Sequence, residues 1–452
     1  MTRQNDKRSG QILILFTLFI GFLMGFAAIA FALAYAMVVR TQLVTALDSA
    51  TLAAIRAVPQ GNAVMQQASQ RAFDANLPSG RLLTLNPTLS APNVTTSAGV
   101  VSVQFTASVD APMFFARWFG RDRMIVSAQS TSARRDRNVI LVLDYSGSVQ
   151  PVLPDIREAA KVFVDSFSDT SDQVGLVIFS TAGRIEYAPQ KPFKSDLQTA
   201  IDNIQPEFLT NHAAGLYWAY RALLELNDPL KSSKMNEIVF FTDGRANWFP
   251  GNFNVKVGGG SNQCASSPVS GVYGITSGNP HYRNRVLSLQ AAASPGAPPI
   301  TPLCPNWVRG QNALQSIQPL WTPPASPTAG SIFPTGVSLS GFRDSAPNFN
   351  QTDPSNAWRE NIAANSVDNL ARLIRQDTNL NIRIHTIGYQ GTDPLQYDVL
   401  ERLANCDGCT RVDPNDAIDA TQAKGRFVAA LNQDDLLSAF LDVAGFIGRI
   451  VQ

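Results

Sequence analysis

The sequence predicts an α/β protein with three successive parts: an amino-terminal transmembrane helix, a small β-rich region, and a doubly wound α/β domain with a long insertion. Three observations lead to this prediction. The run from Ile12 to Val39 carries no charge, polar and apolar residues alternate between residues 62 and 133, and two later apolar runs each end in an aspartate. The expected boundaries are 1–10 for a basic cytoplasmic start, 11–39 for the transmembrane helix, 40–61 for its continuation beyond the membrane, 62–135 for the β-rich region, and 136–452 for the α/β domain, with the insertion at about 246–357.

The overall composition excludes several classes of protein. With 36 Lys and Arg against 35 Asp and Glu in 452 residues, the net charge of +1 gives no electrostatic footprint for nucleic acid. The hydrophobic fraction of 45% is too high for a disordered chain. Four Cys are too few for a disulfide-dense scaffold, and three His argue against a His-rich metal site.

The charge-free run near the amino terminus predicts a membrane anchor. As a helix, Ile12–Val39 is longer than the hydrocarbon core of about 30 Å. A cleaved secretory signal is the alternative, but its apolar core has only about 7–15 residues. Arg3, Lys7 and Arg8 precede the run, whereas Arg40 alone follows closely, which favours a cytoplasmic amino terminus with the rest of the chain beyond the membrane.

Helical spacing continues past the membrane run without a turn signal. Leu43, Leu47, Ala50 and Ala54 form an apolar stripe, and the breakers at 59–61 predict the end of one long helix. The stripe either packs against the chain's own next domain or against other subunits of a helical filament.

The middle region predicts a small sheet. Val100–Val109 and Met124–Ser130 alternate with the period of half-buried strands. Between them, the aromatic stretch Pro112–Gly120 favours a short helix that plugs the sheet, with an exposed contact surface as the alternative.

The remaining chain has the pattern of a parallel sheet covered by helices. Val139–Leu143 and Ile238–Phe241 are continuous apolar runs, as expected for strands buried on both faces. Further expected strands are 174–179 and 382–389, and expected helices are 155–167, a segment after Thr210, 361–376, 395–404 and one that begins at Asp434.

Five oxygen-bearing side chains are expected at the carboxyl ends of these strands, where ligands collect in open α/β sheets. They are Asp144, Ser146, Ser148, Thr210 and Asp243. Two carboxylates and three hydroxyls suit Mg²⁺ or Mn²⁺ and are poor ligands for zinc or copper. Such a set leaves a coordination position for a partner's carboxylate, unless the cation only ties three loops together or the site stays closed.

This set resembles the metal-ion-dependent adhesion site of von Willebrand factor type A domains. The Asp-x-Ser-x-Ser loop matches Asp144, Ser146 and Ser148, the second-loop Thr matches Thr210, and the third-loop Asp matches Asp243. The resemblance implies a doubly wound α/β fold whose metal completes its coordination with an acidic residue of a partner. Tyr145, His212 and Trp248 are expected to shape the rim, with no ligand role for His212.

The insertion begins in the loop just after Asp243 and is rich in Pro, Gly, Ser and Asn. Loops longer than about 15 residues are uncommon in compact domains and are usually functional or disordered. The insertion is therefore either a surface excursion or a lid that selects the partner.

The four cysteines lie in two groups, Cys264 with Cys304 inside the insertion and Cys406 with Cys409 after it. Beyond a membrane anchor an even count suggests disulfides, and pairing within each group is the simplest of three connectivities. A structural zinc site and a redox pair are weaker alternatives, because a second Cys-x-x-Cys and a thioredoxin-like context are missing.

The amino-terminal residues resemble TadG-like proteins of the Flp pilus (tight adherence) assembly family. The matching features are the basic residues and Gly10 before the span, Gln42-Leu43 after it, the run Asp48–Ala54, and Ala111–Gly120. The resemblance implies a single-pass protein of the bacterial inner membrane whose bulk is periplasmic or extracellular. Its implied partner is a pilin, a pilus-assembly component or a surface ligand that offers a carboxylate.

These observations together predict a membrane-anchored, non-enzymatic pilus-assembly or adhesion protein that binds its partner through a divalent cation. The alternative is an envelope receptor or scaffold with the same binding domain and no pilus role. An enzyme is not expected, since the sequence has no His-Glu-x-x-His pair, no Gly-x-Ser-x-Gly elbow and no phosphate-binding Gly-Lys loop.

Overall fold

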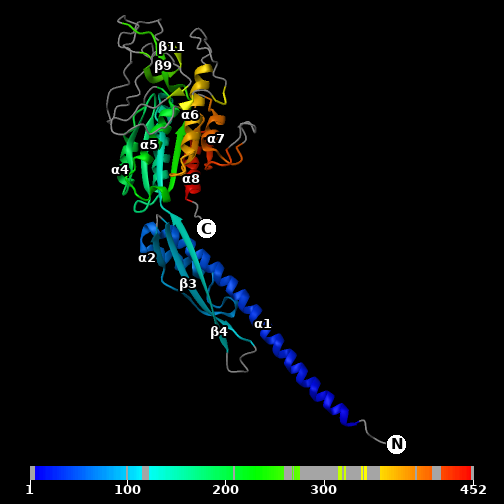
Figure 1. Ribbon diagram of the computed structural model, residues 1–452. Helices are drawn as coiled ribbons and strands as arrows, with labels where there is room; N and C mark the ends of the chain where they lie inside the picture. Colours follow the sequence, from blue (N-terminus) through cyan, green and yellow to red (C-terminus); the bar gives the residue numbers. More distant parts are fainter. Residues whose placement is uncertain are drawn as a thin grey trace. The chain divides into compact units, whose positions relative to one another are not determined.

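The computed structural model forms two compact units, an amino-terminal unit of Met1–Arg135 with Ile450–Gln452 and an α/β unit of Asp136–Arg449 (Figure 1). The residues that the structure describes are 6–97, 100–114, 122–206, 209–258, 267, 269–274, 314–317, 320–321, 337–338, 341–343, 357–391, 394–409 and 419–448.

The amino-terminal unit is built on one long helix, α1 (Asp6–Ala57). Its first half extends alone beyond the strands (Figure 1), with apolar side chains such as Leu13 and Phe22 exposed. In the described part of the chain, this is the one helix long and apolar enough to cross a membrane. The second half is buried along one face, so the apolar stripe that contains Leu43 and Ala50 packs within its own unit.

Helix α1 ends where the sequence places its breakers. A short 3₁₀ turn, Val58–Gln60, leads to Gly61, whose φ of 95° is a conformation that glycine adopts without strain. The next segment is a second helix, α2 (Asn62–Asn76), although it opens the region predicted to be β-rich. Met65 and Phe73 are buried from this helix, because their spacing follows the helical period.

A four-stranded antiparallel sheet covers α1, with β3 at its centre. Residues alternate along β3, and Val103 and Phe105 on the inner face are fully buried, as the period-2 pattern predicts. The strands are β1 (Leu85–Leu89), β2 (Asn93–Ser97), β3 (Val100–Pro112) and β4 (Arg123–Arg135), and a 3₁₀ turn, Arg81–Leu83, precedes them. Of the aromatic stretch at 112–120, residues 115–120 lie outside the described part.

The α/β unit contains a six-stranded sheet in the order β15-β14-β8-β5-β6-β7. All neighbouring strands are parallel except β7, which runs antiparallel to β6 at the edge. Every residue of β5 is buried, as expected for a strand covered on both faces. The strands are β5 (Arg137–Asp144), β6 (Gln173–Phe179), β7 (Gly183–Gln190), β8 (Met235–Thr242), β14 (Arg383–Tyr389) and β15 (Phe427–Ala430).

Helices cover both faces of this sheet and create two apolar cores (Figure 1). Val139, Leu141 and Leu143 of β5 point into one core, and Ile140 and Val142 point into the other. The first core is closed by α3 (Leu153–Asp165), α4 (Lys194–Asp202) and α8 (Asp434–Ile447), and the second by α5 (His212–Leu224), α6 (Ala357–Arg375) and α7 (Tyr397–Ala404). The predicted fold class, a doubly wound α/β domain behind an apolar helix, is confirmed.

The first part of the insertion belongs to the second core. Phe249 and Phe253 in β9 and Tyr273 in β10 are buried in this core, because this stretch supplies large aromatic side chains that pack beside α5 and α6, and Trp248 at the start of β9 is buried as well. Gly274 permits close strand contact, since an added Cβ would lie 2.2 Å from the Asn247 carbonyl oxygen. The strands are β9 (Trp248–Val255), β10 (Val269–Gly274) and β11 (Leu314–Ile317) in one sheet, and β12 (Leu320–Trp321) paired with β13 (Val337–Ser338).

Candidate metal centre

The two aspartates of the predicted site end neighbouring parallel strands. Asp144 is the last residue of β5, and Asp243 follows directly after β8. Because Leu143 pairs with Phe241, the two strands finish at the same edge of the sheet. Both aspartates are buried, with 1% and 2% of their surfaces exposed.

Hydrogen bonds join the first loop to the third. The Ser148 hydroxyl donates to Asp243 Oδ1 at 2.8 Å, and the Ser146 and Ser148 hydroxyl oxygens lie 3.0 Å apart. The Ser146 backbone N–H donates to Asp144 Oδ1 at 2.9 Å. The structure therefore brings four of the five predicted residues together, and Ser148 is the more exposed of the two serines.

Thr210, the fifth predicted residue, is held in the second loop by residues just past Asp243. Its backbone N–H donates to Asn247 Oδ1 at 3.0 Å. Its carbonyl oxygen accepts from the backbone N–H groups of Asn247 at 3.1 Å and Trp248 at 3.0 Å. Asn247 thus clamps the second metal loop to the third, a contact that sequence reasoning did not find.

Asp144 is buried, and the hydrogen bonds described for its carboxylate come from a hydroxyl and a backbone N–H. Its Oδ2 accepts from the Thr242 hydroxyl at 2.6 Å, and its Oδ1 accepts from Ser146. Burial raises the pKa of Asp144 to about 6, and these hydrogen bonds lower it only in part. A divalent cation at this edge would place a positive charge beside the Asp144 carboxylate.

His212 lies behind the site rather than on its rim. Its ring packs edge-on against Phe179 and Phe240, with centroids 5.8 and 5.4 Å away, and burial lowers the pKa of His212 to about 3. Since Thr242 gives its hydroxyl proton to Asp144, the neutral His212 donates from Nε2 to the Thr242 oxygen, 3.0 Å away. Tyr145 and Trp248 are also buried, so none of the three residues expected at the rim is exposed.

The donor set fits a hard divalent cation. Within the described ranges, no cluster of three or more His, Cys, Asp and Glu side chains could hold a metal ion. This candidate site has two carboxylates only, and its other oxygen donors are hydroxyl groups. Two carboxylates and nearby hydroxyls are the oxygen donors that Mg²⁺ and Mn²⁺ prefer, whereas soft metals prefer thiolates and imidazoles. Asp144, Ser146, Ser148, Thr210 and Asp243 are the residues that would hold it.

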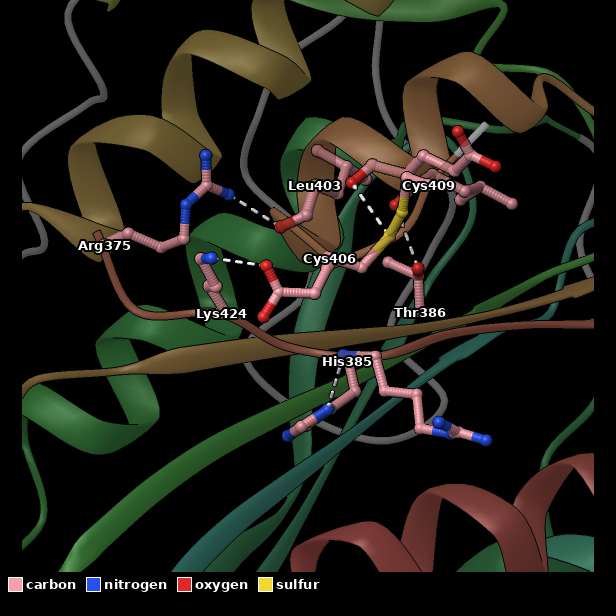
Figure 2. The surroundings of a disulfide bond; sticks show 11 residues. Arg375, His385, Thr386, Leu403, Cys406, Cys409 and Lys424 are labelled. Atoms are coloured by element: carbon pink, nitrogen blue, oxygen red, sulfur yellow. Dashed lines mark hydrogen bonds and ion pairs between the residues drawn. A yellow bond between two sulfur atoms is a disulfide. The ribbon is translucent and has the colours of Figure 1, made fainter. Parts of the chain in front are cut away.

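The cysteine pair after α7 forms a disulfide, and Figure 2 shows it near Arg375, Thr386 and Lys424. Cys406 is buried, and Gly408 adopts a φ of 75° in the turn between the two cysteines. The disulfide borders a cavity of about 250 Å³ whose walls include Glu401, Lys424, Arg426 and Phe446. The other two predicted cysteines, Cys264 and Cys304, lie outside the described residues.

Comparison with known proteins identifies two segments of the chain. A family model described as von Willebrand factor type A domain matches residues 138–292, and one described as putative Flp pilus-assembly TadE/G-like matches residues 10–69. Both resemblances predicted from the sequence are thereby confirmed. No curated protein matches the chain.

Several solved structures are distantly similar. The PilB minor pilin from Streptococcus sanguinis is 16% identical with a TM-score of 0.37, and the match covers 80% of this chain and 78% of that one. The vWF domain of the type V pili tip protein Mfa5 from Porphyromonas gingivalis is 16% identical with a TM-score of 0.36, covering 69% of this chain and 95% of that one. Proximal thread matrix protein 1 from the mussel byssus, with a zinc-occupied MIDAS motif, is 12% identical with a TM-score of 0.33, covering 68% and 47%. These TM-scores are too low to bear on the function.

Proposed function

We propose that this chain, which joins a TadE/G-like segment to a von Willebrand factor type A domain, is a membrane-anchored, non-enzymatic protein of a pilus system. Its α/β unit binds a partner's carboxylate through Mg²⁺ or Mn²⁺. The protein crosses the bacterial inner membrane once through α1, with its amino terminus in the cytoplasm and its bulk in the periplasm or beyond. The partner is a pilin, a pilus-assembly component or a surface ligand.

The observation that carries this proposal is the convergence of Asp144 and Asp243 at one edge of the sheet, joined through the Ser146 and Ser148 hydroxyls. When bound, the cation neutralises the two carboxylates and offers a coordination position to an acidic group from outside. Thr210 completes the oxygen set from the second loop, where Asn247 holds its backbone.

The surroundings of the site favour binding over hydrolysis. His212 is linked to Asp144 through the Thr242 hydroxyl. Its ring is buried and neutral, and it does not reach an incoming substrate. Asp144 already accepts hydrogen bonds from Thr242 and Ser146, so it is poorly placed to take a proton from water.

Calorimetry with Mg²⁺ on the purified full chain in nanodiscs tests the metal site. Asp144→Ala and Asp243→Ala are expected to abolish the binding heat, because each removes a carboxylate ligand. The matched control is Asp196→Ala, an exposed acid near the start of α4, which should bind as the unsubstituted chain does. Equal Mg²⁺ affinity in all four proteins would refute the metal site.

Pilus counts in a deletion strain test the pilus role separately. Complementation with the unsubstituted gene should restore piliation or adherence, and complementation with Asp144→Ala should not. Normal piliation and adherence in the deletion strain would instead assign the metal face to an envelope receptor or scaffold.

A further inference from the structure

The end of the amino-terminal unit nearest the free half of α1 exposes several large apolar side chains. Leu83 is 60% exposed in the turn before β1, Phe114 is 42% exposed just after β3, and Ile125 is 73% exposed near the start of β4. Three separate segments therefore present apolar surface at one end of the unit, and we name these three residues the apolar rim.

Contacts with Tyr35 of α1 hold the rim together. The Tyr35 and Phe114 ring centroids lie 5.2 Å apart, and Phe31, one turn earlier in α1, lies 5.8 Å from Phe114. The Tyr35 hydroxyl donates to the carbonyl oxygen of Leu82, the residue before Leu83. Phe114 and the turn that contains Leu83 thus lie at the height of Tyr35 along α1.

A second contact gives the height of β4 along the helix. Ser130 donates to Asp48 at 2.6 Å, which places these two residues side by side. From Asp48 back to Tyr35 the helix falls by about 20 Å, and from Ser130 back to Arg123 the strand covers about 23 Å. Arg123 and the neighbouring Ile125 therefore lie within a few residues of the height of Tyr35.

The length of α1 indicates where the membrane surface lies along the helix. From Leu13 to Tyr35, α1 rises about 33 Å, close to the hydrocarbon thickness of about 30 Å. Large apolar side chains of α1 are exposed from Leu13 to Val38, and side chains that pack on the unit begin at Tyr35. If α1 spans the bilayer, Tyr35 stands in the headgroup layer, where tyrosine is enriched in membrane proteins.

Exposed arginines suit the same layer. Arg123 donates to the Leu83 and Asp110 carbonyl oxygens at 3.4 and 3.2 Å, exposed Arg81 precedes Leu83 by two residues, and exposed Arg40 follows Tyr35 in α1. Asp110 is engaged by Asn86 at 2.8 Å, while Asp122 is exposed. Guanidinium groups beside inserted apolar side chains can reach lipid phosphates.

We infer that the apolar rim is a lipid-binding surface, and that Leu83, Phe114 and Ile125 insert into the headgroup layer of the bilayer that holds α1. This inference rests on the membrane anchoring proposed above. The amino-terminal unit would then contact the membrane both through α1 and through the apolar rim. Two points of attachment restrict its rotation relative to the membrane, which a single helix would not.

Fluorescence quenching on the full chain in vesicles tests the inference. Ile125→Cys, Phe22→Cys in the exposed run of α1 and Thr95→Cys on exposed β2 are each labelled with an environment-sensitive dye, and dye uptake by the unsubstituted chain gives the background. Thr95 is the matched control: its row of the sheet lies about 26 Å from Ile125 along the strands. Spin-labelled lipids should quench the dye strongly at 22 and 125 and leave it unchanged at 95.

The outcomes separate the inference from the anchor. Quenching at 22 without quenching at 125 overturns the lipid-binding rim while the anchor stands. Loss of quenching at 22 as well overturns the anchor itself. The dye at 125 could instead show a blue-shifted emission that spin-labelled lipids do not quench and that appears only with several copies of the chain per vesicle. This result overturns the inference, because it assigns the rim to contact with a second copy of the chain.

Discussion

Glu237 and Asp243 stand at opposite ends of β8, and both side chains are buried. At the first end, the Glu237 carboxylate accepts from His385 Nε2 at 2.8 Å and has Arg383 at 3.7 Å. At the second end, the Asp144 carboxylate accepts hydrogen bonds from the Thr242 hydroxyl at 2.6 Å and from the Ser146 N–H at 2.9 Å. One end of the sheet is thus electrostatically complete within the chain, and the other is suited to a cation from solution.

The backbone also fixes the histidine at the complete end. The Arg426 N–H donates to His385 Nδ1 at 3.0 Å, so the proton of the neutral ring lies on Nε2 and points at Glu237. Glu237 thus has its partners built into the fold, whereas burial raises the pKa of Asp144 to about 6, and it is at Asp144 that we propose a cation. The comparison predicts opposite responses to the removal of a carboxylate at the two ends.

The largest effect is expected at the complete end. Glu237→Ala should destabilise the α/β unit by about 3 kcal/mol, because it leaves the buried His385 N–H without its charged acceptor and removes the partner of Arg383. Glu237→Gln keeps an acceptor for His385 and should cost much less. Thermal melting of the full chain in micelles measures both, and a Glu237→Ala melting temperature equal to that of the unsubstituted chain would break the comparison.

Asp144→Asn should have the opposite sign in the absence of metal. Because burial raises the pKa of Asp144 from 3.8 to about 6, the folded state holds a proton more tightly than the unfolded state, and stability falls as the pH rises between these two values. The neutral variant should therefore be more stable than the unsubstituted chain at pH 7.5, by on the order of 1–3 kcal/mol, and not at pH 4.

Magnesium sharpens this prediction. Saturating Mg²⁺ should raise the melting temperature of the unsubstituted chain at pH 7.5 and leave Asp144→Asn unchanged. A variant that melts lower than the unsubstituted chain at pH 7.5 without metal would mean that the hydrogen bonds to Asp144 outweigh its buried charge.

Much of this arrangement could be predicted from the sequence. The strand 139–143 is a continuous apolar run that ends in Asp144, and 238–241 leads equally to Asp243, so parallel pairing alone predicts that the two aspartates meet. Each strand gives a continuous apolar run because both of its faces are buried. The charge-free run from Ile12 to Val39 likewise predicts the apolar helix.

The residues that support the site could not be predicted. Thr242 reaches Asp144 only because β5 and β8 pair in one particular register, and Asn247 reaches Thr210 across 37 positions. The Pro- and Gly-rich composition of the insertion also concealed Phe249 and Phe253, which pack into the core although they follow the third metal loop. Composition reports a segment's average, whereas burial depends on a few large side chains.

Thr242→Val should weaken Mg²⁺ binding by about tenfold, the lower end of the range for residues that orient metal ligands. The substitution removes the hydroxyl that joins Asp144 to His212 and keeps nearly the same shape. Thr242→Ser is the matched control, since it retains the hydroxyl and should bind Mg²⁺ nearly as the unsubstituted chain does. Calorimetry at pH 7.5 gives both affinities, and equal weakening in the two variants would attribute the effect to packing instead of the hydrogen bond.

The smallest effect is expected at the clamp between the second and third loops. Asn247→Leu leaves the Thr210 N–H without its acceptor, which should cost about 1 kcal/mol of stability and weaken Mg²⁺ binding several-fold, because Thr210 is then free to shift. Asn247→Asp keeps the acceptor oxygen and should restore the stability, although its added charge would also strengthen cation binding. High salt separates these two contributions, since screening weakens the long-range attraction and leaves the hydrogen bond intact. If Mg²⁺ affinity stayed at the unsubstituted value in Asn247→Leu while its stability fell, the clamp would support only the fold, and Thr210 would keep its position through the remaining contacts of its loop.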